Sequence, residues 1–279
     1  MTTQTPATAT ATASTVGSVT SKDGTRIAYE RTGAGPALIL VDGAMCSRAM
    51  GPMAAIAQAM SPHFTVYRYD RRGRGESGDT LPYAIEREVE DLAALIREAG
   101  GSAHLFGVSS GGALALEAAN QRLGVGKLAV FEVPFIVDDT RDPVPADYLA
   151  TLEDHIAHGR NGAALKMFLA SVGMPGFMRW LMPLLPAWSR MLAIAPTLAY
   201  DTRLVAGEQT GKPLARDRWA QVSAPTLVID GGKSPAWMRH AARAIANVLP
   251  GATHQTLPGQ THAVKAEVLA PALVAFFRA

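Results

Sequence analysis

Residues 103–122 read AHLFGVSSGGALALEAANQR, with Gly107-Val108-Ser109-Ser110-Gly111 near the centre. The apolar residues before Gly107 predict a buried strand, and the Ala- and Leu-rich residues after Gly111 predict a helix. A serine hydroxyl is a weak nucleophile that needs an exposed position and a neighbouring base. A sharp strand-to-helix turn gives this exposure, and its glycines keep the turn free of clashes. The stretch therefore predicts Ser109 as a catalytic nucleophile, although the bare five-residue pattern also fits a turn that only begins a helix.

Outward from this turn, short apolar runs alternate with amphipathic segments. The predicted strands span residues 26–31, 37–41, 64–69, 103–108, 127–133, 224–229 and 254–257. The predicted helices span residues 45–60, 86–98, 112–122, 238–248 and 264–278. Such alternation is typical of a parallel sheet with helices on both faces. The predicted fold class is therefore α/β, with a mostly parallel sheet.

The alternation stops between residues 134 and 222, where only helical segments and prolines follow one another. We therefore expect a core domain of residues 16–137 and 216–279, with an all-helical cap (a lid) inserted at 138–215. The methionines and aromatic residues of this insertion suit a pliable pocket for an apolar substrate, although packing of the lid on the core explains most of them. Residues 1–15 are rich in Thr and Ala and are predicted to be a disordered tail.

Composition excludes several classes of protein. There are 26 Lys and Arg against 24 Asp and Glu, a net charge of +2, and no block of five basic residues, so we expect no nucleic-acid partner. No apolar run is long enough to cross a membrane, and the N-terminal residues do not resemble a secretory signal. The single cysteine, Cys46, excludes an internal disulfide and fits a reducing compartment. These features predict a cytoplasmic protein without a membrane partner.

Three further segments, with the Ser109 turn, resemble landmarks of the α/β-hydrolase superfamily. Residues 70–77, DRRGRGES, are similar to the D-x-R-G-x-G-x-S loop that follows the fourth strand in that family. Residues 41–44, VDGA, lie where the family usually has His-Gly, and residues 225–231 and 258–262 match its late landmarks. The resemblance covers nearly all of the chain after the tail and implies the α/β-hydrolase fold. No nucleotide-binding glycine motif and no cysteine pair is present, so we expect neither a cofactor nor a metal.

The resemblance implies that His262 is the catalytic base. A neutral imidazole can take the serine proton and return it to the leaving group. The order of Ser109, then an acid, then His262 along the chain also fits this fold.

The acid of the triad departs from the usual pattern. Residues 231–235 read GGKSP, so Ser234 stands where the family usually has Asp, and a hydroxyl cannot carry the negative charge that an imidazolium needs. Some members, the haloalkane dehalogenases among them, place the carboxylate at the end of the sixth strand, where this chain has Glu132. We therefore predict Glu132 as the acid and keep Asp230 as the alternative.

The resemblance also implies an oxyanion hole made of two backbone N–H groups, those of Ser110 and Ala44. Backbone donors tolerate a change of side chain, so Asp42 in place of the usual His need not abolish the hole. Asp42 could brace the loop through its own oxygens or interact with an arginine such as Arg48.

Together these features predict a serine hydrolase that cleaves a carboxylic ester or lactone through an acyl-enzyme on Ser109. The expected partner is a small, apolar, ester-like substrate, and the sequence leaves the oligomeric state open. Cofactor-free perhydrolases (haloperoxidase-like) and C–C bond hydrolases use similar triads and remain alternatives, whereas dehalogenation needs an Asp nucleophile. A non-catalytic ligand-binding protein on the same fold is the alternative from another class, because Asp42 and Ser234 depart from the family pattern.

Overall fold

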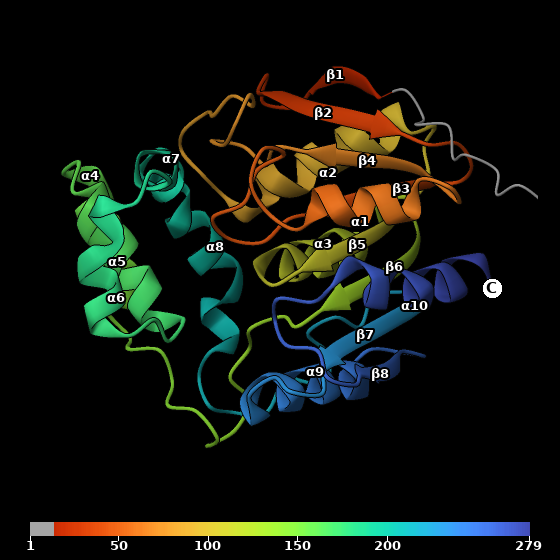
Figure 1. The fold of residues 1–279 in the computed structure, drawn as a ribbon. Coiled ribbons are helices and arrows are strands. Elements are labelled where there is room, and N and C mark those ends of the chain that lie inside the picture. Colours follow the sequence, from red (N-terminus) through yellow and green to blue (C-terminus); the bar gives the residue numbers. More distant parts are fainter. Residues whose placement is uncertain (1–13) are drawn as a thin grey trace, which may run out of the picture.

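The core of the protein is a mixed sheet of eight strands in the order β1-β2-β4-β3-β5-β6-β7-β8 (Figure 1). The computed structural model describes residues 14–279. The strands are β1 Thr15–Thr20, β2 Arg26–Thr32, β3 Ala37–Val41, β4 Thr65–Tyr69, β5 Ala103–Val108, β6 Val125–Phe131, β7 Thr226–Gly231 and β8 Thr253–Leu257. The β1–β2 and β2–β4 pairs are antiparallel, and the other five pairs are parallel. The predicted α/β class with a mostly parallel sheet is confirmed.

Helices cover both faces of this sheet. They are α1 Met53–Met60, α2 Ile85–Glu98, α3 Ser110–Asn120, α9 Ala236–Val248 and α10 Ala266–Arg278. Successive side chains of a strand point to opposite faces. In β3, Leu38 and Leu40 pack in the cluster that contains α1 and α10, whereas Ile39 and Val41 pack in the cluster that contains α2, α3 and α9. Burial on both faces explains why this strand is an unbroken apolar run in the sequence.

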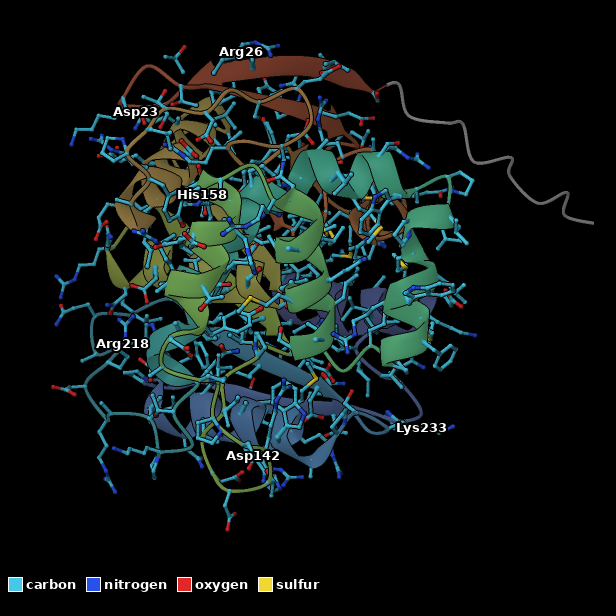
Figure 2. All side chains as sticks on the ribbon, turned by 90° about the vertical axis from the view of Figure 1, so that its left-hand side faces the viewer. Asp23, Arg26, Asp142, His158, Arg218 and Lys233 are labelled. Atoms are coloured by element: carbon cyan, nitrogen blue, oxygen red, sulfur yellow. The ribbon has the colours of Figure 1, made fainter. Side chains whose placement is uncertain are left out.

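A helical insertion joins β6 to β7. It contains α4 Tyr148–Ala157, α5 Asn161–Ser171, α6 Gly176–Leu181, α7 Trp188–Ile194 and α8 Leu198–Val205, with the short 3-10 turns η1 Met182–Leu184, η2 Ala195–Thr197 and η3 Ala206–Glu208. Figure 1 shows α4 to α7 at one end of the sheet, with α8 between them and the core; α8 packs on α3. Figure 2 looks onto the insertion from its outer side, where His158 follows the last turn of α4.

The elements differ from the sequence-based expectation mainly at the N-terminal strand, at the start of α1 and at the end of β6. The strand β1 was not predicted, since its small and polar residues form an exposed sheet edge. The helix expected from residue 45 begins at Met53, because Gly51 has a φ of 136° and Pro52 precedes the first turn. The strand expected to run to residue 133 ends at Phe131. Residues 1–13 of the predicted tail lie outside the described residues, and Thr15 already belongs to β1.

Among the described residues, no helix combines the length and the apolar character that crossing a membrane requires.

Candidate active site

Ser109 lies in a strained turn between β5 and α3. Its φ is 56° and its ψ is −130°, a backbone conformation that L-residues rarely adopt. The glycines around it are required by space, because a Cβ on Gly107 would lie 2.5 Å from the Gly111 carbonyl oxygen and one on Gly111 would lie 2.3 Å from that of Val41. The Ser109 N–H donates to the Phe131 carbonyl at 3.0 Å and fixes the turn to the next strand. This geometry exposes the hydroxyl at the carboxyl edge of the parallel strands.

Glu132 and His262 form a hydrogen-bonded pair beside this turn. The imidazole Nδ1 lies 2.8 Å from Glu132 Oε2, and Glu132 Oε1 accepts the Gly231 N–H at 2.8 Å. Glu132 is fully buried and has a φ of 47°, so its backbone is also held in an uncommon conformation. Because Nδ1 faces a carboxylate, the proton of a neutral imidazole belongs on Nδ1, which leaves Nε2 as the acceptor.

Ser109 and His262 both line one cavity of about 630 Å³. Within residues 14–279, no hydrogen bond joins the Ser109 hydroxyl to the His262 ring. Catalytic contacts of this kind are often long before a substrate is bound. The two side chains therefore share one chamber in which a substrate could contact both.

The alternative acid, Asp230, faces another histidine. Its Oδ2 lies 2.9 Å from His254 Nε2, and the carboxylate is fully buried. Ser234 is also buried, and its hydroxyl has no hydrogen-bond partner among the described residues. The structure thus brings Glu132, and neither Asp230 nor Ser234, to His262.

The two predicted oxyanion residues, Ala44 and Ser110, line the same cavity. Ser110 opens α3, where the first N–H groups have no partner inside the helix. On the other loop, Arg74 Nη1 donates to the Gly43 carbonyl at 2.7 Å. The C=O and N–H of a trans peptide point in opposite directions, so holding the Gly43 carbonyl on Arg74 directs the Ala44 N–H away from that arginine. A Cβ on Gly43 would lie 3.0 Å from Ser109 Cβ, which places this peptide against the Ser109 side chain.

A buried ion-pair network connects this loop to the helical insertion. Asp201 of α8 accepts Arg71 Nη1 at 2.7 Å, Arg74 Nη2 at 2.6 Å and the Ser110 hydroxyl at 2.8 Å. Arg71 also donates twice to Glu88 of α2, at 2.7 Å each. Burial acts to raise the pKa of Asp201, but Arg74 and Arg71 outweigh it and hold that pKa below its ordinary value.

Sequence reasoning found the segment DRRGRGES only as a family landmark and missed this network. Three arginines in a loop directly after a buried strand were a usable signal. Nothing in the sequence around Asp201 distinguishes it from an exposed acid of an amphipathic helix.

Asp42 is buried beside Cys46 in the loop after β3. Burial raises the pKa of Asp42 to about 7, although a hydrogen bond with Cys46 and the charges of Arg74 and Arg71 act to lower it. Of the two possibilities left open for Asp42, the one in which it interacts with Arg48 does not occur. The Arg48 side chain instead donates to Asp70 at 2.9 Å and to Glu76 at 2.5 Å. Asp42 is thus a structural carboxyl within the loop. The neighbouring peptides are held by Arg71 and Arg74, which donate to the backbone carbonyls of residues 42 and 43.

Comparison with known proteins identifies the family of the fold. The model of the alpha/beta hydrolase family matches residues 38–275 of the chain. The chain belongs to the α/β-hydrolase family. A solved α/β-hydrolase from Sphaerobacter thermophilus is 50% identical, with a TM-score of 0.84, and the match covers 94% of this chain and 100% of that one.

More distant structures share the fold of this α/β-hydrolase. A thermophilic esterase from Thermogutta terrifontis is 22% identical, with a TM-score of 0.66 and coverage of 95% of this chain and 98% of that one. An enol-lactonase from Burkholderia xenovorans is 20% identical, with a TM-score of 0.71 and coverage of 94% and 100%. At this identity they support the fold only.

Proposed function

We propose that this α/β-hydrolase cleaves a carboxylic ester or a lactone through an acyl-enzyme on Ser109. The observation that supports the proposal is the cavity that Ser109 and His262 both line, together with the hydrogen bond between His262 and the buried Glu132. The esterases and the enol-lactonase of the same fold are compatible with this reaction class but do not identify the substrate.

In this mechanism His262 Nε2 takes the hydroxyl proton as Ser109 Oγ attacks the carbonyl carbon. The backbone N–H groups of Ala44 and Ser110 donate to the developing oxyanion. The imidazolium then gives its proton to the leaving oxygen, and the C–O bond of the ester breaks. Water, deprotonated by His262, attacks the acyl-enzyme and restores Ser109. Glu132 stabilises the imidazolium and fixes its tautomer throughout.

We further propose that residues 138–215 act as the lid over this chamber. Residues of the insertion and of the core line the cavity together, which is the arrangement that a lid requires. A cytoplasmic location is part of the same proposal, supported by the single cysteine.

Labelling with a fluorophosphonate tests the proposal. A base-activated serine attacks phosphorus as it attacks a carbonyl carbon, so intact-mass analysis of the wild-type protein should show one adduct. The matched control is Ser109→Ala, which should remain unmodified while keeping its fold, as judged by circular dichroism. A folded wild-type protein that stays unlabelled after long exposure would favour the non-catalytic ligand-binding alternative.

A further inference from the structure

Arg141 lies on the wall of the catalytic cavity, on the loop that leads from β6 to α4. Its guanidinium stacks on the Trp237 ring of α9, with Cζ 4.2 Å from the ring centre. Its Nη2 donates to the carbonyl of Ser171, the last residue of α5. Figure 2 labels the next residue, Asp142, on the loop that runs below the helices of the insertion.

The loop that carries Arg141 is anchored to α9 at two points. Asp138 Oδ2 lies 2.6 Å from His240 Nδ1, and Asp138 Oδ1 accepts the Thr140 N–H at 3.0 Å. The second point is the stacking of Arg141 on Trp237, one helical turn before His240. A side chain held in this way loses little further freedom when it binds a ligand.

The charge of Arg141 has no acidic partner among residues 14–279. In the part of the chain that the structure describes, no carboxylate oxygen lies within 4.0 Å of its guanidinium. Burial lowers the pKa of Arg141 and no neighbouring carboxylate opposes this effect, yet an arginine stays protonated in proteins. Asp201 also lines the cavity, but its carboxylate already pairs with Arg71 and Arg74. The cavity therefore contains one guanidinium whose charge is not neutralised by the protein.

The geometry of the stack leaves donors available for a ligand. A ring covers the flat face of a guanidinium, whereas its N–H groups point outward in the plane. One of these groups reaches Ser171, and the others remain for a planar anion such as a carboxylate, which guanidinium binds with two parallel hydrogen bonds. The surrounding wall is largely apolar, with Val144, Phe168, Val205 and Met238 among its residues.

We propose that Arg141 binds a carboxylate of the substrate, so that the enzyme acts on esters or lactones bearing a free carboxylate separated from the scissile bond by a hydrocarbon spacer. This inference rests on the proposed function and names its substrate class. All three parts of this site line one cavity. The apolar wall contacts the spacer, the Arg141 guanidinium binds the anion, and Ser109 attacks the carbonyl carbon.

Two para-nitrophenyl esters of equal acyl length test the proposal. Para-nitrophenyl hydrogen adipate ends in a carboxylate, and para-nitrophenyl hexanoate ends in a methyl group. The readout is the ratio of kcat/KM for the adipate ester to that for the hexanoate ester. The wild-type ratio should exceed about 10, and Arg141→Gln should lower it by about 10- to 100-fold, mainly through KM, because a charge-assisted hydrogen-bond pair is lost. Arg141→Lys should restore part of the ratio, since it keeps the charge without the planar fork.

The matched control is Arg203→Gln. Arg203 is also an arginine of the insertion, but it pairs with Glu153 and does not line the cavity. This variant should keep the wild-type ratio. If Arg141 only ties the loop to α5 and α9, Arg141→Gln will lower both rates in parallel and leave the ratio unchanged, which would overturn the proposal. A wild-type preference for the hexanoate ester would overturn it as well.

Protection against fluorophosphonate labelling repeats the comparison where turnover is slow. Monomethyl adipate should slow the labelling of the wild-type protein more than methyl hexanoate does, and Arg141→Gln should abolish this difference. If Ser109 is labelled and the two esters slow its labelling equally, the proposed role of Arg141 is wrong, but the proposed function still stands. A Ser109 that is never labelled contradicts the proposed function instead, so the two failures are distinguishable.

Discussion

Asp42 is a buried carboxyl in the loop that supplies one candidate oxyanion donor. Its pKa of about 7 lies well above the ordinary value for Asp, so the folded protein keeps a proton that the unfolded chain releases. Between about pH 4 and pH 7 the folded state thus binds more protons than the unfolded state at this residue. The contribution of Asp42 to the free energy of unfolding must therefore fall as the pH rises through this range.

The variant Asp42→Asn tests this assignment. An amide does not titrate, so the melting temperature of the variant minus that of the wild type should increase from about pH 5 to about pH 8. A change on the order of 5 °C is expected from a pKa raised by several units. Thermal unfolding at matched ionic strength measures the difference. Two melting curves that shift in parallel across this range would show that Asp42 is charged in the folded protein throughout.

Single residues differ in how far the sequence can predict them. Ser109 and Glu132 each stand next to a strand end, so a local pattern places them, and the structure brings Glu132 to His262 as expected. Arg141 and Asp201 depend on contacts with segments distant in the chain, and no local pattern marks them. The surroundings of Asp42 could not be predicted for the same reason, because several arginines follow the loop and only packing decides between them.

The loop between β4 and α2 carries three buried arginines that form two separate systems. Arg72 donates to Asp91 of α2 at 2.7 and 2.8 Å and does not contact the loop after β3. Arg71 and Arg74 share Asp201 of α8 and also donate to the backbone of residues 42 and 43. Both systems stabilise the loop, but only the second connects the insertion to the candidate oxyanion hole.

Replacing the central acid of each system separates their roles. Asp201→Asn leaves the buried guanidinium of Arg74 without its charge partner, which costs about 3–5 kcal/mol of stability. Asp91→Asn removes one of the two carboxylates that pair with Arg72 and leaves Asp23, so it also lowers stability. Only Asp201→Asn releases Arg74, which orients the Gly43–Ala44 peptide. In this variant, kcat on para-nitrophenyl hexanoate should therefore fall by about 10- to 100-fold, with a small change in KM. Asp91→Asn should keep kcat within a few-fold below its melting temperature. Equal losses of kcat in the two variants would show that the network acts on stability alone.

Elements were predictable where they are buried. The strands β3, β5 and β7 follow from largely apolar runs because both of their faces are covered. The strand β1 escaped prediction since an exposed edge needs no apolar pattern. The start of α1 was misplaced by eight residues, because small residues that can be helical occupy a loop held by Gly51 and by a bridge between Ser47 and Met50.

At the scale of the whole molecule, the parallel order of the strands assembles the candidate site. Ser109 follows β5, Glu132 follows β6 and His262 lies beyond β8, so segments more than a hundred residues apart meet at the carboxyl edge of one sheet. This convergence is predictable from the order of strands and helices. The composition of the cavity is not, because it depends on how the insertion folds back over that edge and brings Arg141 and Asp201 to the wall.

The proposed acid, Glu132, departs from the usual arrangement of the family, and a pair of variants tests this assignment most directly. Glu132→Gln keeps the shape of the side chain but removes the charge beside His262, whereas Asp230→Asn changes the carboxylate that faces His254. On para-nitrophenyl hexanoate, Glu132→Gln should lower kcat by about two to four orders of magnitude, because an imidazolium without its anionic partner is destabilised and its tautomer is free. Asp230→Asn should lower kcat by less than about tenfold. If Glu132→Gln instead keeps most of its activity while Asp230→Asn loses it, the acid of the triad follows β7 and the assignment of Glu132 is wrong.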